Sequence, residues 1–369
     1  MFGIQTYFLS KALGYLIRIS IYSIDSTLLD KDIFLIFLLG LNIIDGISFL
    51  LTILLQLFLF SNSHKFNKLI INFSAIAVYF GMLLFFLVII LYEYEYVTQA
   101  FLDIFVFDNI FLQKNLMPLL TVAGTIFAYF SLTIVNYGDF SRYVNNENEL
   151  KKGNLSLLLN LVIFSFFAVF IVIGSDVILN KNLENMDRIL TNPTDIIGKF
   201  DNILITVIVL IFILFSSLST NLIANYIPAQ NSLLNFFPTK FNLKKSGITI
   251  VILGFIIGIF WLPLLSQIGA LSFIDTIAAF FGPFFGVMII DYYLIKKAQL
   301  INKDIFSSKE DGTYYYTGCW HIKAIYSLLI GFVFAAATIW NESLIYLQSY
   351  SWIIGTFISS LTYYLLASK

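Results

Sequence analysis

Six hydroxyl and amide side chains lie within ten residues of each other, from Ser216 to Asn225, in an otherwise apolar stretch. Ser216, Ser219 and Thr220 have i, i+3 and i+4 spacing, so on a helix they share one face. Their hydroxyls, together with nearby backbone carbonyls, suit a hard monovalent cation such as Na⁺. Asn225 follows about 8 Å further along the helix axis, and its amide both donates and accepts, which suits a planar amide-bearing ligand. Ordinary hydrogen bonding between neighbouring helices is an equally good interpretation of the same residues.

Other polar side chains offer less specific chemistry. Gln5 is an amide in an aromatic setting, which is typical of packing as well as of a site. Asn42 and Asp45 lie one turn apart, so Asp45 is either an ion- or proton-binding group or a structurally bonded carboxylate. Asp139 and Arg142 are three residues apart, a spacing that lets them pair on a helix as a structural or a gating contact.

Nothing in the sequence indicates an enzyme. The two histidines, His64 and His321, lie in loops or at boundaries, and the single cysteine excludes a thiolate metal cage. Neither a nucleophile arrangement nor a Gly-rich phosphate loop is present. With a net charge of −1 and three arginines, the chain has no surface for nucleic acid. We therefore expect no catalytic residues, no cofactor and no nucleic-acid partner.

The composition indicates that a lipid bilayer surrounds these residues. Of the 369 residues, 59% are hydrophobic and 12% are charged, whereas a soluble domain has about 45–50% and about 25%. Because one membrane helix takes about 20 apolar residues, the apolar content suffices for roughly ten spans. Long apolar runs without two-residue alternation favour helices over a β-barrel. The predicted spans are 1–24, 33–60, 69–92, 115–137, 154–175, 202–227, 247–265, 267–295, 324–341 and 343–367.

Charge in the connecting loops predicts the orientation. Most of the 21 basic residues fall in alternate loops and at the C-terminus, while the other loops are rich in acids. By the positive-inside tendency, the basic loops and the C-terminus face the cytoplasm. We expect an integral protein of a bacterial inner (plasma) membrane.

Four segments, in order along the chain, resemble the nucleobase–cation symporter family, which includes cytosine, uracil, allantoin and hydantoin permeases. They are Phe2–Tyr7 (FGIQTY), Asn136–Tyr143 (NYGDFSRY), Ser219–Asn225 (STNLIAN) with the following Pro228, and Gly282–Tyr293 (GPFFGVMIIDYY).

This resemblance implies an all-α membrane protein of the leucine-transporter type, with a five-plus-five inverted repeat within a twelve-span design. In that frame residues 1–369 form one transmembrane transporter domain. Residues 1–92 would be the remainder of the first repeat, 115–295 the second repeat, and 324–367 two extra C-terminal helices. Helices one and two of the design would be absent, so the ten spans would be its third to twelfth.

The resemblance also assigns roles to residues. It implies that Gln5 and Asn225 bond the substrate and that Phe130 stacks on its planar ring. Ser219 and Thr220 would supply hydroxyls to a sodium site, and Ser216 a backbone carbonyl. Two positions depart from the family pattern: Met1 and Phe130 stand where tryptophans are usual.

The expected function is a secondary active transporter for a nucleobase or a related cyclic amide, coupled to Na⁺ or H⁺. Two alternatives stay open, a truncated remnant that does not transport and an amino-acid carrier of the same fold. Since the absent first helix would supply the other half of the cation site, either the chain's start is assigned too far downstream or the gene is decayed.

Overall fold

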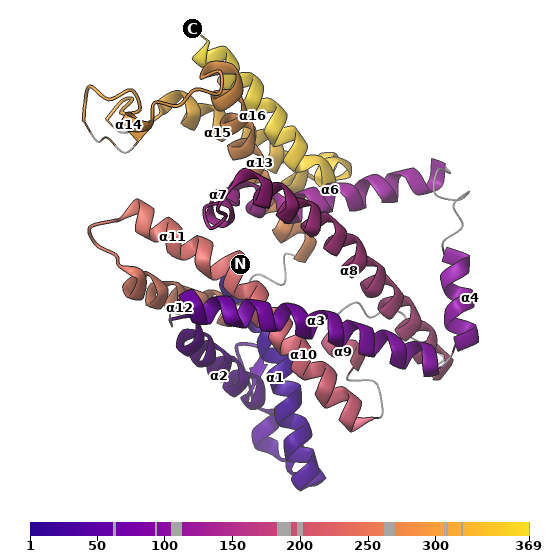
Figure 1. Ribbon diagram of the computed structural model, residues 1–369. Helices are drawn as coiled ribbons and strands as arrows, with labels where there is room; N and C mark the ends of the chain where they lie inside the picture. Colours follow the sequence, from indigo (N-terminus) through magenta and orange to yellow (C-terminus); the bar gives the residue numbers. More distant parts are fainter. Residues whose placement is uncertain are drawn as a thin grey trace. The chain divides into compact units, whose positions relative to one another are not determined.

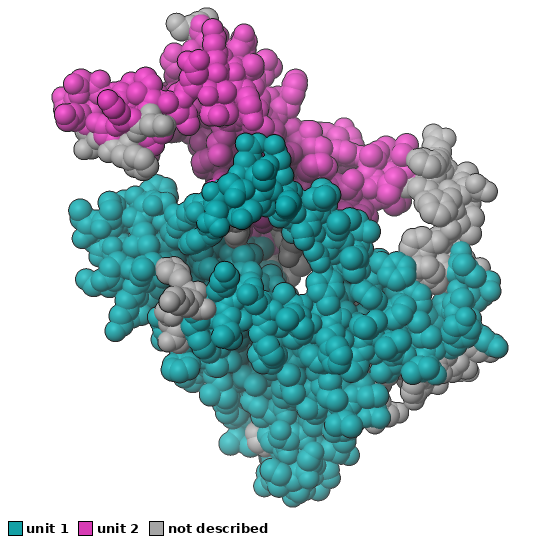
Figure 2. All heavy atoms as spheres, viewed as in Figure 1, with its two compact units in different colours: residues 1–106, 141–267 teal, residues 107–140, 268–369 magenta. Residues whose placement is uncertain are grey.

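The computed structural model describes residues 1–61, 64–92, 94–104, 113–182, 193–197, 202–261, 270–305, 307, 309–318 and 320–368. The described residues are overwhelmingly helical, as Figure 1 shows, and they include one two-stranded hairpin. It divides into two compact units, coloured separately in Figure 2. Unit 1 comprises residues 1–106 and 141–267, and unit 2 comprises residues 107–140 and 268–369.

Unit 1 contains most of the helices. They are α1 (Phe2–Ile24), the 3-10 turns η1 (Ser26–Asp30) and η2 (Asp32–Leu35), α2 (Ile43–Phe60), α3 (His64–Tyr92), α4 (Tyr94–Ile104), α8 (Glu147–Asn182), α9 (Pro193–Ile197), α10 (Ile203–Thr220), the π-helical turn η3 (Asn221–Tyr226), α11 (Ile227–Phe236) and α12 (Leu243–Ile259). The short helix α7 (Tyr137–Ser141) lies where the chain passes from unit 2 to unit 1.

Asparagine side chains begin three of these helices. Asn42, Asn202 and Asn242 each accept a hydrogen bond from the backbone N–H three residues later, at 2.8, 3.1 and 2.8 Å. This contact satisfies a donor that the first turn of a helix otherwise leaves unpaired. The starts of α2, α10 and α12 are therefore encoded locally.

Helix α1 packs against α2, α10 and α12, while α3 packs against α8 and α10. The backbones of α1 and α12 touch at Gly3 and Gly254, where a β-carbon on either residue would overlap the other helix. Small residues allow this close approach, as in other membrane helix pairs. An apolar core within unit 1 joins α1, α3, α8 and α10 through buried residues such as Ala12, Phe85 and Leu210.

Unit 2 contains α6 (Gln113–Val135), α13 (Ala270–Ile289), the π-helical turn η6 (Ile290–Ile295), α14 (Asn302–Ile305), α15 (Ile322–Trp340), the 3-10 turn η7 (Glu342–Tyr350) and α16 (Ser351–Ala367). Helices α13, α15 and α16 pack on one another, and α6 packs on α13. Gly282 and Gly286 of α13 face the backbone of α16, where a side chain would not fit. Across the same contact, Thr356 and Ser359 donate to the carbonyls of Gly282 and Pro283 at 3.0 and 3.1 Å.

Seven helices among the described residues are long and apolar enough to cross a membrane. They cover Ile43–Phe60, Phe66–Leu91, Leu116–Val135, Glu147–Asp176, Ile203–Phe236, Asp275–Ile295 and Ile322–Trp340. These seven fall on predicted spans. At the other three predicted places the chain is also helical, as α1, α12 and α16, and these stay predictions as spans.

Two predicted boundaries are wrong. The span predicted over 33–60 begins at Ile43, because Phe37–Leu38 (β1) and Leu41–Asn42 (β2) form an antiparallel hairpin. Leu39 and Gly40 both have positive φ, 54° and 79°, as a two-residue type I′ turn requires. The span predicted over 343–367 begins as an α-helix at Ser351, after the 3-10 turn η7.

Candidate functional site

The two amides singled out in the sequence meet within unit 1. Gln5 lies in the first turns of α1, and Asn225 lies in the π-helical turn η3 that follows α10. Asn225 Nδ2 donates to Gln5 Oε1 at 2.6 Å, although 220 residues separate the two. Both side chains are half-buried, so each keeps part of its amide accessible.

The π-helical turn has a local cause. Pro228 follows it and has no N–H to donate, and its ring crowds the carbonyl of the preceding turn. A wider turn with i→i+5 hydrogen bonds relieves that conflict, and such turns are frequent at functional sites. The turn Asn221–Tyr226 carries both Asn221 and Asn225.

Behind the Gln5–Asn225 pair lies a fully buried set of neutral polar side chains, which we call the amide network: Thr6, Gln56 and Asn221. Asn225 Nδ2 also donates to Asn221 Oδ1 at 2.9 Å. Asn221 Nδ2 donates to Thr6 Oγ1 at 2.9 Å, and Thr6 Oγ1 lies 2.8 Å from Gln56 Oε1. None of these three residues is more than 1% exposed.

The amide network and the pair that it supports contain no titratable group. Their hydrogen-bonding pattern therefore does not depend on pH in the physiological range. The arrangement has no nucleophile and no acid or base, so it suits recognition of a neutral polar ligand rather than bond breaking. Among the described residues there is also no cluster of three or more His, Cys, Asp or Glu side chains of the kind that holds a metal ion.

The three residues assigned to a cation lie together at the end of α10. Ser219 Oγ and Thr220 Oγ1 both donate to the backbone carbonyl of Ser216, each at 3.0 Å. Ser219 is 8% exposed and Thr220 is exposed. Two hydroxyl oxygens and one carbonyl oxygen thus occupy one short stretch of helix, and all three are oxygen ligands of the type that hard cations take.

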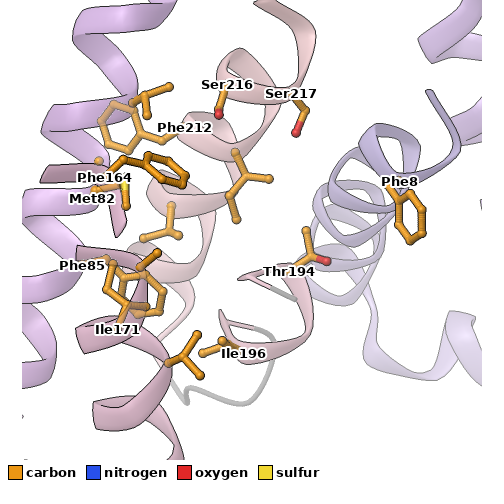
Figure 3. Close-up of a pocket in the computed structure, with 16 residues that line it drawn as sticks. Phe8, Met82, Phe85, Phe164, Ile171, Thr194, Ile196, Phe212, Ser216 and Ser217 are labelled. Atoms are coloured by element: carbon orange, nitrogen blue, oxygen red, sulfur yellow. The ribbon is translucent and has the colours of Figure 1, made fainter. Parts of the chain in front are cut away.

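A cavity of about 260 Å³ within unit 1 is lined in part by Ser216. Figure 3 shows Ser216 and Ser217 at one end of it, with Met82, Phe85 and Phe164 along an apolar wall. Gln5 Nε2 lies 3.4 Å from the carbonyl oxygen of Ser217. Of the predicted site residues, Ser216 lines this cavity, and Gln5 contacts a second lining residue, Ser217.

Phe130, the predicted stacking residue, is half-buried on α6 in unit 2, whereas Gln5 and Asn225 belong to unit 1. Its stacking role stays a prediction. Asp139 lies half-buried in α7, and Arg142 is exposed, with its guanidinium 5.5 Å from the centroid of the Tyr143 ring. Their pairing also stays a prediction.

Asp45 has a structural partner. Arg18 Nη2 lies 2.7 Å from Asp45 Oδ1, an ion pair that joins α1 to α2. Of the two interpretations of Asp45, the structure favours the bonded carboxylate.

Sequence analysis missed the supporting role of the amide network. Asn221 and Thr6 stand inside segments that it singled out, yet neither received a function. Gln56 gave a signal of its own, because an amide in an apolar span is costly unless it faces a partner. Contacts across 50 and 215 residues were needed to connect them.

A family model described as "Permease for cytosine/purines, uracil, thiamine, allantoin" matches residues 1–359. Among curated proteins, the chain is 25% identical over 206 residues to the purine-uracil permease NCS1 of Arabidopsis thaliana, covering 56% of this chain and 33% of that protein. It is 27% identical over 246 residues to the allantoin permease of Bacillus subtilis, covering 66% of this chain and 48% of that protein. In these matches the chain spans half or less of the length of its relatives.

Among solved structures, the chain is similar to Mhp1, a nucleobase-cation-symport-1 family transporter in a closed conformation with bromovinylhydantoin bound. The TM-score is 0.68 at 18% identity, over 98% of this chain and 71% of that one. An inward-facing conformation of Mhp1 gives a TM-score of 0.62 at 17% identity, over 100% of this chain and 72% of that one. The predicted leucine-transporter-type fold is confirmed by this likeness.

Proposed function

Because the chain belongs to the family of permeases for cytosine/purines, uracil, thiamine and allantoin, we propose that it carries a nucleobase or a related cyclic amide across a membrane as a secondary active transporter. The family is one of transporters, not of enzymes. The protein is an integral membrane protein, and its substrate and its coupling ion are the subject of this proposal.

The Gln5–Asn225 contact carries the proposal. Two amides from helices far apart in the sequence meet at 2.6 Å while both stay half-buried. A cyclic amide offers an N–H and a C=O in one plane, and the two side-chain amides can form a hydrogen bond with each of these groups. Such a ligand would stack on Phe130, which keeps an aromatic face at that position.

The oxygens of Ser216, Ser219 and Thr220 support coupling to a monovalent cation. They lie close together near the end of α10, and Ser216 also lines the cavity. Neutral oxygen ligands favour Na⁺, whereas H⁺ coupling needs a titratable group that the amide network does not contain. We therefore favour Na⁺ as the coupling ion. Asp139 and Arg142 would act as a gating or structural pair at the cytoplasmic end.

We also propose the family's order of repeats for this chain: residues 1–92 in the first repeat, 115–295 in the second and 324–367 as additional C-terminal helices. The basic loops and the C-terminus would face the cytoplasm, in a bacterial inner membrane.

Uptake by proteoliposomes that contain the full chain tests the function. Labelled uracil, cytosine, allantoin and hydantoin are offered with an inward Na⁺ gradient, an inward H⁺ gradient or neither. We expect saturable uptake of at least one ligand that depends on the Na⁺ gradient. Uptake driven by H⁺ alone contradicts Na⁺ coupling, and binding without uptake supports a non-transporting protein. If none of the four ligands is bound or taken up, the proposed substrate class is rejected.

A further inference from the structure

We infer that Asn221 is a positioning residue that fixes the hydrogen-bond polarity of the Gln5–Asn225 pair, so that the pair presents one acceptor and one donor to a ligand edge with adjacent N–H and C=O groups. This inference rests on the proposed function for its ligand, and on the contacts of Asn221 for its geometry.

The polarity starts at a backbone carbonyl. Asn221 Nδ2 lies 3.3 Å from the carbonyl oxygen of Phe2 and 2.9 Å from Thr6 Oγ1. A backbone carbonyl accepts hydrogen bonds and cannot donate them, so the amino group of Asn221 must face Phe2. The oxygen of the same amide, Oδ1, then points away from Phe2. Asn221 is 0% exposed, and reversing its amide would leave a buried carbonyl facing another carbonyl.

Asn225 must donate to Asn221 Oδ1 from its amino group. Its Nδ2 donates to Asn221 Oδ1 at 2.9 Å and to Gln5 Oε1 at 2.6 Å. An amide amino group has two hydrogens, and both are used by these contacts. Among the residues that the structure describes, Asn225 Oδ1 receives no hydrogen bond, so it is the acceptor of the pair.

Gln5 is the donor of the pair. Its Oε1 accepts from Asn225, so its Nε2 is the donor that faces outward. Nε2 lies 3.4 Å from the carbonyl oxygen of Ser217, a long contact that requires the same orientation. Because the Ser217 contact is long and therefore weak, the direction is set mainly from the Phe2 carbonyl through Asn221.

This direction selects a class of ligand edge. A secondary amide within a ring places N–H beside C=O, which matches Asn225 Oδ1 and Gln5 Nε2. A ring that offers acceptors alone leaves Asn225 Oδ1 unpaired against another acceptor, which is costly in a desolvated site. Uracil has the required edge, and 1,3-dimethyluracil has the same ring with both N–H groups methylated.

The test measures the affinity of the purified full chain for uracil and for 1,3-dimethyluracil. In the unsubstituted protein we expect uracil to bind about tenfold or more tightly. Asn221→Leu frees the Asn225 amide to rotate and offer a donor to a carbonyl, so the preference should shrink to about twofold or less. Weakened binding of both probes with the preference intact would indicate a merely structural role and would overturn the inference.

A second pair of variants covers the case in which Asn221→Leu does not fold. Thr6→Val removes the hydroxyl that accepts from Asn221 and keeps the side-chain volume, whereas Thr6→Ser keeps the hydroxyl. We expect Thr6→Val to reduce the preference for uracil, because only the longer 3.3 Å contact to the Phe2 carbonyl then orients Asn221, and Thr6→Ser to retain it. Equal preferences in the two variants would contradict the inference.

A ligand-independent measurement separates this inference from the proposed function. Thr6→Val and Asn221→Leu are combined in a double-mutant cycle on the unfolding temperature. We expect the double variant to lose less than the sum of the single losses, because both remove the same hydrogen bond. If neither probe binds the unsubstituted protein, the assignment of these ligands fails, and additive losses in the cycle overturn the polarity inference in either case.

Discussion

Two polar clusters, one in each unit, differ in whether their side chains carry charge. In unit 1, the amide network is made of neutral amides and hydroxyls and lies among α1, α2 and the η3 turn. In unit 2, a charged cluster lies where η6, α15 and α16 meet: Asp291, Lys296, Tyr316, His321 and Tyr363. There Tyr363 donates to Asp291 at 2.6 Å, and Lys296 pairs with the same carboxylate at 2.9 Å.

The difference follows from position along the helices. Lys296 and His321 stand at the ends of apolar segments, where charged heads reach water or lipid headgroups at modest cost. The amide network lies within the helices, where burying a charge costs much free energy and burying neutral, hydrogen-bonded groups costs little. We therefore expect the amide network to control ligand binding and the charged cluster to control stability and its pH dependence.

The largest expected effect is on ligand binding. Asn225→Ala removes the acceptor offered to the ligand and the donor to Gln5, and should weaken the binding of uracil by about 1–3 kcal/mol. Calorimetry or a thermal-shift titration of the purified protein measures this change. Gln299→Ala, which truncates an exposed amide on the loop after η6, serves as the control. Equal affinities for Asn225→Ala and the control would remove Asn225 from the site.

The charged cluster should respond through stability instead. Tyr363 is 1% exposed, and its hydroxyl contacts both Asp291 and His321 Nε2, the latter at 2.9 Å. Tyr363→Phe deletes that hydroxyl with little change in shape and should lower the free energy of unfolding by about 1–2 kcal/mol. Denaturant unfolding followed by fluorescence measures the loss, with Tyr346→Phe, 72% exposed, as the matched control. If Tyr363→Phe changes ligand affinity more than stability, the charged cluster does not act mainly on stability as proposed.

Acidification should act on unit 2 through His321. Burial lowers the pKa of His321, with Lys296 and Lys323 acting in the same direction and the Asp291 carboxylate opposing them. Because burial disfavours the charged imidazole in the folded state, its contribution to stability is present above the ordinary histidine pKa of about 6.5 and is lost as the pH falls below it. The unfolding temperature should drop between pH 7.5 and 5.5, and His321→Gln should flatten that drop. An equal slope in the variant would exclude His321 as the cause.

The smallest effect is expected inside the amide network itself. Gln56 Nε2 is buried and has no hydrogen-bond partner among the residues that the structure describes. Gln56→Leu removes this unsatisfied donor and one contact to Thr6 together, so stability should change by less than about 1 kcal/mol. A thermal melt beside that of Thr6→Val measures it. A large loss would show that Gln56 has a further partner that holds it in place.

Most helices could be predicted from the sequence, because long apolar runs have few other solutions in a bilayer. The hairpin over residues 37–42 could not, since Phe37, Leu38 and Leu41 are as apolar as a membrane helix. Only Gly40 marked the turn, and one glycine in an apolar run is also compatible with a helix.

The sequence predicted which residues form the candidate site, but not which residues hold them in position. Gln5 and Asn225 were identified by type and by family resemblance, and the structure brings them together. The direction of their amides depends on Thr6, Asn221 and the Phe2 carbonyl, which meet across long sequence separations. Such tertiary contacts have no local pattern that a single sequence displays.

The π-helical turn at Asn221–Tyr226 also has a consequence for how the chain tolerates changes in length. A wide turn amounts to one extra residue in a helix, and each residue turns an α-helix by about 100°. The faces of α10 and α11 are therefore out of phase by that angle, and α11 still meets α12 through Gln230 and the carbonyl of Leu243. Removing one residue from the turn would leave an unbroken helix, but would rotate α11 relative to Ser216 and Ser219. The turn thus sets the angle between the face of α10 that carries the oxygens of Ser216 and Ser219 and the face of α11 that packs on α12.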